Sequence, residues 1–411
     1  GYKLDEIATN APDFLIPSAH MQTLQNMVDW CLAEGLIAVI DPVHNWANHD
    51  DPALEFETDD LPKLGKIWEQ VAARFADYDL KNVVFEVMNE PHSEDDVAQI
   101  IATSLTAIRS QAGNERRIVI VPGDGFSTRQ ALIDALDNNE IPANDPFLIG
   151  TFHYYDPKTF TAQGASTITW GTAGEFEQVV TDFDAVVSAN NGWASSNGTE
   201  SLPVYLGEFG VDNGAPAADR KEWLSWIRMQ AEARGFSWAH WNMYQNTDTS
   251  KGMGPWTDTE KDFPATRSFD ADPLEALTGR YEVEEGANAG GVTVESTYAG
   301  FTGTGYAAFP TNTGAATWVR VENIFTPVAT NYTVKIHYAS VSNRLMRLVV
   351  RNDTTTTHTL DNQLFPATGG LNSWSTLNVP LPFEAGELGN LKFVATPDPG
   401  VQLDWIQITL P

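Results

Sequence analysis

With 411 residues, the chain is long enough for two or three domains, and its 42% hydrophobic and 19% charged residues are typical of globular proteins with sizeable cores. Acidic residues outnumber basic ones 55 to 24, and the formal net charge of −31 disfavours nucleic acids and anionic membranes as partners. A solvated acidic surface without a specific role explains that charge equally well. Cys31 is the only cysteine, which excludes an intrachain disulfide, and no apolar run approaches the roughly 20 residues that span a bilayer.

Up to about Gly279, short apolar segments that predict strands alternate with amphipathic segments that predict helices. The predicted strands are 36–40, 83–87, 118–121, 148–152, 204–206 and 236–241. The predicted helices include 21–34, 61–75, 95–111 and 219–233. Such alternation indicates a parallel sheet with helices on both faces, and the number of units favours a (β/α)8 barrel over a doubly wound sheet. A glycine-rich phosphate loop follows none of these strands, which also argues against a nucleotide-binding fold.

After Arg280 the helical periodicity disappears and short alternating strands follow. They are predicted at 317–321, 332–337, 345–350, 377–380, 391–395 and 402–410, with turn segments rich in Gly, Thr, Asn and Pro between them. This pattern is typical of an all-β sandwich of the jelly-roll type. The sequence therefore predicts two domains, a barrel at residues 1–279 and a sandwich at residues 280–411.

Two glutamates stand where predicted barrel strands end. Glu90 follows the segment 83–87 and precedes Pro91, which biases Glu90 towards extended geometry. Glu208 follows the segment 204–206 and has glycines close on either side. Because the carboxyl ends of barrel strands form one face, we expect the two carboxylates to lie about 5 Å apart, as glycoside hydrolysis with a protonated acid and an ionised nucleophile requires. The alternative is that each glutamate is a strand-end acid in an ion pair or a helix cap.

Three ordered motifs carry a resemblance to a known family. They are Asn89-Glu90-Pro91, Phe152-His153-Tyr154-Tyr155-Asp156-Pro157 and Tyr205-Leu206-Gly207-Glu208-Phe209-Gly210. In order and spacing, residues 7–277 resemble glycoside hydrolase family 5, a (β/α)8 clan that contains cellulases and mannanases. The resemblance implies that Glu90 is the general acid/base and Glu208 the nucleophile, and that the anomeric configuration is retained.

The same resemblance implies a set of sugar-binding residues. Asn89 would hydrogen-bond the sugar 2-hydroxyl group. His153 and Tyr155 match the family's His-x-Tyr pattern, in which the tyrosine hydroxyl assists the nucleophile. His44 matches the sugar-facing histidine after the third strand, and Trp241 matches the tryptophan floor of the cleavage subsite. As an alternative, either histidine is a structural residue with satisfied hydrogen bonds. We predict no metal site in this half of the chain, and no cofactor for catalysis.

Further tryptophans are candidates for outer sugar subsites, because an indole stacks on the apolar C–H face of a sugar. These candidates are Trp46, Trp170 and Trp256, and Trp193 is a further tryptophan expected in a loop. They could equally be packing residues. Their number favours an open cleft that cuts within chains over a closed pocket that cuts at chain ends.

The front of the predicted barrel is short. The strand at 36–40 corresponds to the third strand of the family and is preceded by a helix from about Ser18 to Glu34. The residues before Ser18 are too few for two strands and a helix at about 3.3 Å and 1.5 Å per residue. The family's second strand ends with an arginine, and no arginine precedes Arg74. We therefore expect the first two strands to be missing from this chain and supplied by upstream residues or by another chain.

The C-terminal domain resembles carbohydrate-binding modules of families 35 and 6. The segments that carry the resemblance are 281–285, 298–306, 332–339 and Leu403-Asp404-Trp405-Ile406, with family 35 preferred for the Gly-Thr-Gly-Tyr turn. The resemblance implies that Glu282, Glu284 and Asp404 coordinate a structural Ca²⁺, for which hard carboxylate oxygens are suitable ligands. A solvated acidic edge is the alternative.

Three residues of this domain are candidates for contact with a sugar. Trp374 is expected in a loop, where its indole could stack on a sugar ring. Tyr306 and Asn343 are further candidates, although aromatic residues of a sandwich are more often part of the core.

The leading hypothesis is a secreted bacterial endo-β-glycanase that hydrolyses β-1,4-glucan, either cellulose or mixed-linkage glucan, by double displacement. A β-mannanase of the same family is the nearest alternative. The rival from another class is a non-catalytic polysaccharide-binding protein, which the missing front of the barrel suggests. The expected partner is the polysaccharide, and neither nucleic acid nor a membrane is expected to bind.

Overall fold

The computed structural model describes residues 4–43, 60–92, 97–162, 167–242, 244–246, 252–254, 256–258, 268–269, 276–310, 317–326, 328–396 and 400–410. These residues form two compact units. The first contains residues 1–156, 173–210 and 230–241, and the second contains 157–172, 211–229 and 242–411. The predicted domain boundary between Gly279 and Arg280 stays a prediction.

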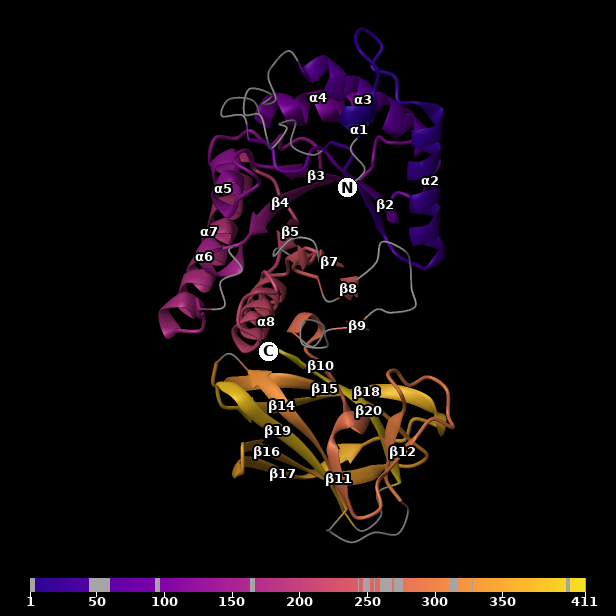
Figure 1. Cartoon of the computed structure of the whole chain (residues 1–411), viewed down its shortest axis with the longest axis vertical. Helices are drawn as coiled ribbons and strands as arrows, with labels where there is room; N and C mark the ends of the chain where they lie inside the picture. Colours follow the sequence, from indigo (N-terminus) through magenta and orange to yellow (C-terminus); the bar gives the residue numbers. More distant parts are fainter. Residues whose placement is uncertain are drawn as a thin grey trace. The chain divides into compact units, whose positions relative to one another are not determined.

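A six-stranded parallel sheet forms the centre of the first unit (Figure 1). Its strands are β1 (Ala38–Ile40), β2 (Val83–Glu86), β3 (Val119–Pro122), β4 (Leu148–Tyr154), β5 (Val204–Phe209) and β6 (Ser237–Trp238). Each strand pairs in parallel with the next one in chain order. The sequence prediction of a parallel α/β sheet of the (β/α)8 class is thus confirmed, and all six carboxyl ends lie at one edge.

Helices alternate with these strands along the chain. They are α1 (Leu4–Ile7), α2 (Ser18–Ala33), α3 (Leu61–Arg74), α4 (Val97–Arg109), α5 (Arg129–Asp137), α6 (Lys158–Thr161), α7 (Ala173–Asn197) and α8 (Ala217–Ala233). None of the helices in the described ranges is both long enough and apolar enough to cross a membrane.

Helix α3 shows how a helix fixes the end of a strand. Its fully buried apolar side chains recur at helical spacing at Leu64, Ile67, Trp68 and Val71. The Trp68 indole Nε1 donates a hydrogen bond to the Val87 carbonyl at 3.0 Å, directly after β2. This bond satisfies a backbone acceptor where the strand ladder has stopped, and it holds the segment that leads to Glu90.

The second unit contains an antiparallel sandwich. One sheet has the order β12-β13-β20-β15-β18, with β10 paired to β20, and the other has the order β11-β14-β19-β16-β17. The elements are β10 (Arg280–Glu282), η3 (Val283–Glu285), β11 (Ala287–Ala289), β12 (Thr293–Glu295), β13 (Tyr306–Ala308), β14 (Trp318–Thr326), β15 (Thr330–Ser340), β16 (Arg344–Asn352), β17 (Thr355–Phe365), β18 (Gly370–Phe383), β19 (Gly386–Ala395) and β20 (Val401–Thr409). Three short strands, β7 (Tyr244–Asn246), β8 (Trp256–Asp258) and β9 (Ser268–Phe269), form a separate sheet.

The sandwich core follows from alternation along its strands. Val334, Ile336, Leu348, Phe393 and Leu403 come from four different strands, and each is fully buried. Side chains between them point to the outer faces, as the period of two requires. The predicted all-β sandwich is confirmed.

Candidate active site and acidic cluster

Glu90, His153 and Glu208 meet at the carboxyl edge of the parallel sheet. One ligand-type atom of each residue lies within 4.8 Å of those of the other two. His153 Nδ1 is 2.9 Å from Glu90 Oε1 and 3.5 Å from Glu208 Oε2. The side chains come from β4, from β5 and from the segment after β2, so the sheet brings together residues far apart in sequence. The two carboxylates that the sequence singled out therefore share one site.

The hydroxyl group of Tyr155 donates a hydrogen bond to Glu208 Oε2 at 2.7 Å. Burial and the neighbouring Glu208 charge raise the pKa of Tyr155, so the phenol stays a proton donor at ordinary pH. Burial also raises the pKa of Glu208, while His153 and the Tyr155 hydrogen bond act in the opposite direction. Burial alone would lower the pKa of His153, but its bond to Glu90 and the charge of Glu208 produce a net rise. Tyr155, Glu208 and His153 therefore each bind a proton more tightly in the site than in water.

Glu90 does not have the extended geometry expected before a proline. Its φ is +49°, in the left-handed region that non-glycine residues rarely adopt. The Asn89 amide donates to the Val43 carbonyl at 2.9 Å, and the Phe126 amide donates to the Pro91 carbonyl at 2.8 Å. These bonds on both sides of Glu90 hold the turn and override the preference that Pro91 imposes. Strained backbone of this kind is common at functional sites.

A β-bulge at Gly207 sets the direction of Glu208. In the pairing of β4 with β5, Phe152 lies opposite Leu206, but the next residue, His153, lies opposite Glu208. Gly207 is the extra residue, and one extra residue inverts the alternation of the strand beyond it. A Cβ atom at this position would lie 3.2 Å from His153 Nε2, so only glycine fits here without moving the histidine.

The bulge brings Tyr205 and Glu208 to the same face of β5. Strict alternation would place Tyr205 and Glu208 on opposite faces of β5. Burial raises the pKa of Tyr205, and the charges of Glu86 and Glu208 raise it further, so the three groups lie near one another. The glycines beside Glu208 stand out in the sequence, but the bulge was not predicted from them.

Glu86 is a site residue that the sequence analysis missed. It is the last residue of β2, and only 8% of it is exposed. Burial raises its pKa to about 7, with His153 lowering and Glu208 raising it. A glutamate inside an otherwise apolar strand is the sequence signal that could have identified it, because an unpaired buried carboxylate is costly.

The other predicted residues of this half have different outcomes. Asn89 is buried beside Glu90, and Trp241 follows β6, where its amide bonds to the Phe209 carbonyl at 2.9 Å and 42% of the residue is exposed. The positions of both fit their predicted roles, which stay predictions. His44 and Trp46 lie outside the described residues, and the structure describes only the backbone of Trp256 in β8.

Two of the tryptophans considered for outer subsites are buried. Trp170 is 4% exposed, and its amide bonds to Asp219. Trp193 is also 4% exposed and lies in α7, where its indole donates to the Ile141 carbonyl at 3.3 Å. Both indoles are therefore packing residues, and the prediction that Trp170 forms an outer subsite is wrong.

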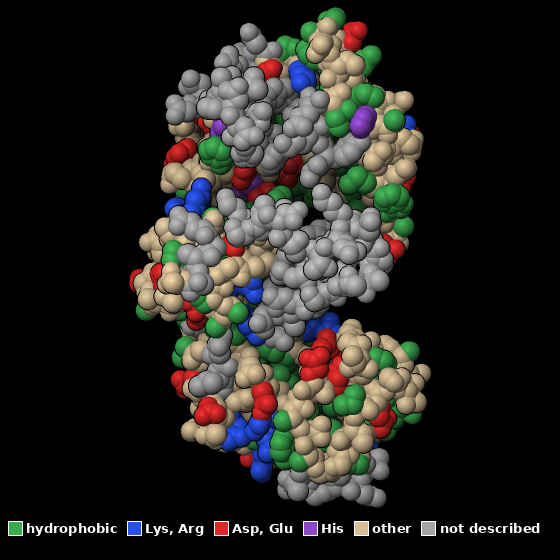
Figure 2. All heavy atoms as spheres, in the orientation of Figure 1, with side chains coloured by type: hydrophobic (Ala, Val, Ile, Leu, Met, Phe, Trp, Pro, Cys, Tyr) green, Lys and Arg blue, Asp and Glu red, His purple; other side chains and the backbone are tan. Residues whose placement is uncertain are grey.

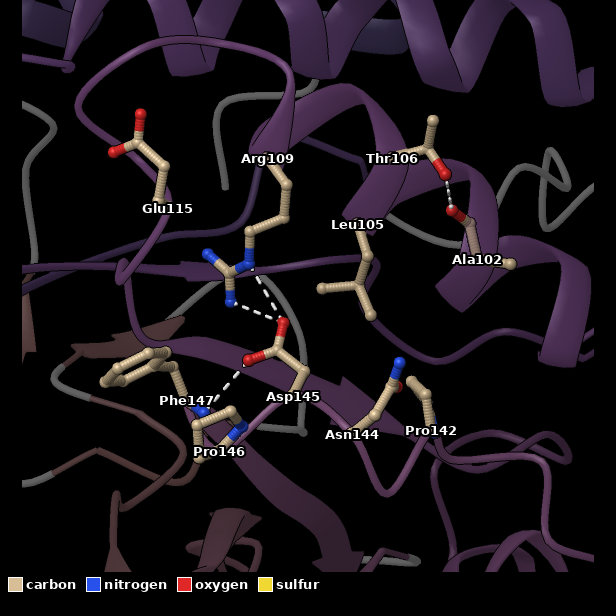
Figure 3. A pocket seen from close by; sticks show the side chains of 10 residues that line it. All are labelled: Ala102, Leu105, Thr106, Arg109, Glu115, Pro142, Asn144, Asp145, Pro146 and Phe147. Carbon is tan, nitrogen blue, oxygen red and sulfur yellow. Dashed lines mark hydrogen bonds and ion pairs between the residues drawn. The ribbon is translucent and has the colours of Figure 1, made fainter.

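A concavity of about 500 Å³ lies at the opposite end of the sheet (Figure 3). It is lined by Leu105, Arg109, Pro142 and residues 144–147, and Phe147 directly precedes the first residue of β4. Arg109 forms an ion pair with Asp145 at 2.9 Å and also donates to two backbone carbonyls. Because the amino ends of barrel strands are the stability face, this pocket is not a second candidate for catalysis.

In the second unit, Glu282, Glu284 and Asp404 form an acidic cluster in which one carboxylate oxygen of each lies within 4.8 Å of the others. Burial raises the pKa of Glu282 to about 7, with Arg280 opposing and the two other acids adding to the shift. Burial also raises the pKa of Glu284, whose Oε2 is buried without a hydrogen bond to any described residue. His337 Nδ1 lies 2.7 Å from Asp404 Oδ2. Crowded carboxylates with an unsatisfied oxygen fit a bound cation.

The predicted sugar contacts of the sandwich require two corrections. Trp374 lies within β18 and not in a loop, and its Nε1 donates to the Ala299 carbonyl at 3.0 Å. Tyr306 is fully buried, with its ring between those of Phe301 and Trp374, so it belongs to the core and cannot contact a ligand. Asn343 is exposed, but its side-chain oxygen accepts from the Ala367 amide at 2.9 Å, which indicates a role in loop structure.

Known protein families match both parts of the chain. The model of the cellulase family, glycosyl hydrolase family 5, matches residues 2–247, and the model of carbohydrate-binding module family 6 matches residues 282–410. Endoglucanase H of Acetivibrio thermocellus is 34% identical over 269 residues, which is 64% of this chain and 27% of that protein. Cellulase/esterase CelE of the same organism is 29% identical over 254 residues, 57% of this chain and 30% of that protein. The chain thus spans less than a third of either relative.

Solved structures show the same likeness. The cellulose synthase subunit Z of Clostridioides difficile superimposes with a TM-score of 0.54 and 30% identity, over 67% of this chain and 85% of that one. A hyperthermophilic endo-β-1,4-glucanase in complex with substrate has a TM-score of 0.54 and 26% identity, over 67% of this chain and 82% of that one. Of the two module families that the sequence resembles, the match is to family 6.

Proposed function

The chain belongs to glycosyl hydrolase family 5, and on this basis we propose that it is a retaining endo-β-1,4-glucanase that acts on cellulose or mixed-linkage glucan. The observation that carries the proposal is the meeting of the Glu90 and Glu208 carboxylates within 4.8 Å. Retaining enzymes hold their carboxyl groups about 5 to 5.5 Å apart, whereas inverting enzymes leave room for a water molecule at about 6.5 Å or more.

In the proposed reaction, Glu208 attacks the anomeric carbon while Glu90 gives its proton to the departing glycosidic oxygen. The covalent sugar ester then reacts with water, whose proton Glu90 takes as the water oxygen attacks, and Glu208 leaves as a carboxylate. The Tyr155 hydroxyl bonds to Glu208 and so favours its ionised form, in the direction that nucleophilic attack needs. The exposed indole of Trp241 offers an apolar surface for a sugar ring.

The test is the release of reducing sugar from carboxymethylcellulose, mixed-linkage β-glucan and mannan. Glu90→Gln and Glu208→Gln should each lower kcat about 100-fold or more, because they remove proton transfer and the nucleophile. Glu200→Gln is the matched control, since Glu200 is an exposed glutamate in the same half of the chain. Full activity in either site variant would contradict the assignment, and faster cleavage of mannan than of both glucans would favour the β-mannanase alternative.

We further propose that the family 6 module holds the polysaccharide and that its acidic cluster binds Ca²⁺. Glu282, Glu284 and Asp404 supply hard oxygen ligands, and the unsatisfied Oε2 of Glu284 supports the fit. The ion would neutralise carboxylates on β10, on η3 and on the last strand, β20. Because a polysaccharide such as cellulose is too large to enter a cell and is hydrolysed outside it, we propose that the protein is secreted.

A further inference from the structure

The outer face of the sheet β11-β14-β19-β16-β17 carries neighbouring cations. Arg320 on β14 lies opposite Lys392 on β19, and Lys392 lies opposite Val349, two residues before Arg351 on β16. Residues adjacent to these cations, such as Leu391 and Phe393, are fully buried in the core, so alternation turns the cations to the other side. We use the term basic face for the four residues Trp318, Arg320, Arg351 and Lys392. Figure 2 shows Lys and Arg side chains gathered near the ends of β16 and β17 of Figure 1.

Lys392 is the centre of the basic face. Its Nζ lies 4.1 Å from the centre of the Trp318 ring, and the Arg320 guanidinium lies 5.6 Å from the same ring. Burial lowers the pKa of Lys392, and the charges of Arg351 and Arg320 lower it further. Within the described ranges, no carboxylate forms an ion pair with Lys392. An anion placed there would relieve the repulsion among these cations.

The two arginines differ in how far their charges are compensated. Arg320 forms an ion pair with Glu322 on its own strand. Arg351 donates to the Thr354 carbonyl, a neutral acceptor. The basic face therefore keeps two uncompensated positive charges in a chain where acids outnumber bases 55 to 24. Such a local excess, set against the rest of the molecule, marks a surface that attracts anions.

We infer that the basic face binds a polysaccharide that carries carboxylate groups, separately from the Glu90 and Glu208 pair. Lys and Arg bind carboxylates through charge-assisted hydrogen bonds, and the Trp318 indole offers an apolar surface to a sugar ring. Duplex DNA carries a charge about every 1.7 Å, so the net charge of −31 repels it strongly. A polymer with one carboxylate per sugar has a lower charge density and is repelled less.

The test is binding of the full chain to polygalacturonate and to its fully methyl-esterified form, which has the same backbone without the charge. Polygalacturonate should bind more tightly, and added salt should weaken its binding because it screens the charges. Lys392→Gln and Arg351→Gln should each weaken binding about fivefold, the upper value for one exposed ion pair. Lys392→Arg should retain it.

Lys335→Gln is the matched control, because Lys335 also lies over a tryptophan, 5.8 Å from the Trp405 ring, but on the other sheet. It should leave the affinity unchanged, and none of the variants should alter hydrolysis of soluble glucan. Equal binding of the charged and esterified polymers would overturn the inference. So would an equal loss in Lys335→Gln, or equally tight binding of single-stranded DNA of matched charge.

Discussion

At the level of single residues, the geometry of the site depends on Gly207, a position where no side chain fits. Glu208 lies opposite His153 because Gly207 is the extra residue of the bulge in β5. A Cβ atom on Gly207 would lie 2.7 Å from Thr151 Oγ1 and 3.2 Å from His153 Nε2. Glycine is needed here because the neighbouring Thr151 and His153 side chains leave no space for a Cβ atom.

We therefore predict that Gly207→Ala lowers kcat about 100-fold, because a shift of about 1 Å in a positioned catalytic group has an effect of this size. The measurement is kcat and KM on soluble β-glucan. Gly174→Ala is the control, since an added Cβ there meets nothing within 4 Å. Unchanged kcat in Gly207→Ala, with the fold intact, would show that the bulge does not position the site.

The sequence was sufficient to place Glu90 and Glu208 at one site, because both follow apolar segments whose carboxyl ends meet in a parallel sheet. It did not predict the left-handed backbone of Glu90 or the burial of Trp170 and Tyr306. Those features depend on which distant groups pack against the residue. Such tertiary contacts cannot be inferred from the residues that are close in sequence.

At the level of elements, the parallel sheet and the sandwich were predictable because hydrophobic periodicity is a local property of the chain. The irregularities within strands were not. In the pairing of β15 with β20, Ile336 lies opposite Ile406 but Tyr338 lies opposite Leu403, so β20 has a bulge beside the acidic cluster. This bulge places both Asp404 and Trp405 opposite His337, where strict alternation would separate them.

Ca²⁺ should stabilise the sandwich through this cluster. At a free concentration 100 times the dissociation constant, binding to the folded state adds about 2.7 kcal/mol to the free energy of unfolding. The measurement is the thermal midpoint with Ca²⁺ and with EDTA. Asp404→Asn should lose the difference between the two, whereas Glu285→Gln, an exposed acid next to the cluster, should keep it. A midpoint that does not respond to Ca²⁺ would remove the metal proposal.

At the level of the whole molecule, the raised carboxyl pKa values act in one direction. The pKa of Glu86 and that of Glu282 are each about 7 in the folded state, and those of Glu208 and Glu284 are also raised by burial. Each group binds its proton more tightly when folded than when unfolded. For Glu86 and Glu282, the stability that this provides is complete below about pH 4.5 and is lost as the pH rises through about 7.

We predict that the urea midpoint of unfolding, measured in EDTA, is higher at pH 5 than at pH 8. Glu86 alone, with its pKa raised from 4.5 to about 7, accounts for on the order of 3 kcal/mol across this range. The net charge of −31 acts in the same direction, because ionisation increases self-repulsion. Glu86→Gln should flatten the pH dependence. A midpoint that rises towards pH 8 would contradict this.

We propose that Glu208 attacks the sugar and that Glu90 transfers the proton. Replacing either glutamate by glycine leaves space for an azide ion. An aryl β-cellobioside with a good leaving group is a suitable substrate, because its leaving group departs without protonation by a general acid. In Glu208→Gly, azide replaces the nucleophile and attacks from the α face. In Glu90→Gly, azide attacks the α-linked sugar ester on Glu208 from the β face.

The most direct measurement is therefore the NMR configuration of the glycosyl azide that each variant forms. The two roles predict an α-azide from Glu208→Gly and a β-azide from Glu90→Gly. The reverse pattern would exchange the two roles. If neither variant forms a glycosyl azide while the unaltered enzyme hydrolyses the same substrate, the two glutamates are not the catalytic pair.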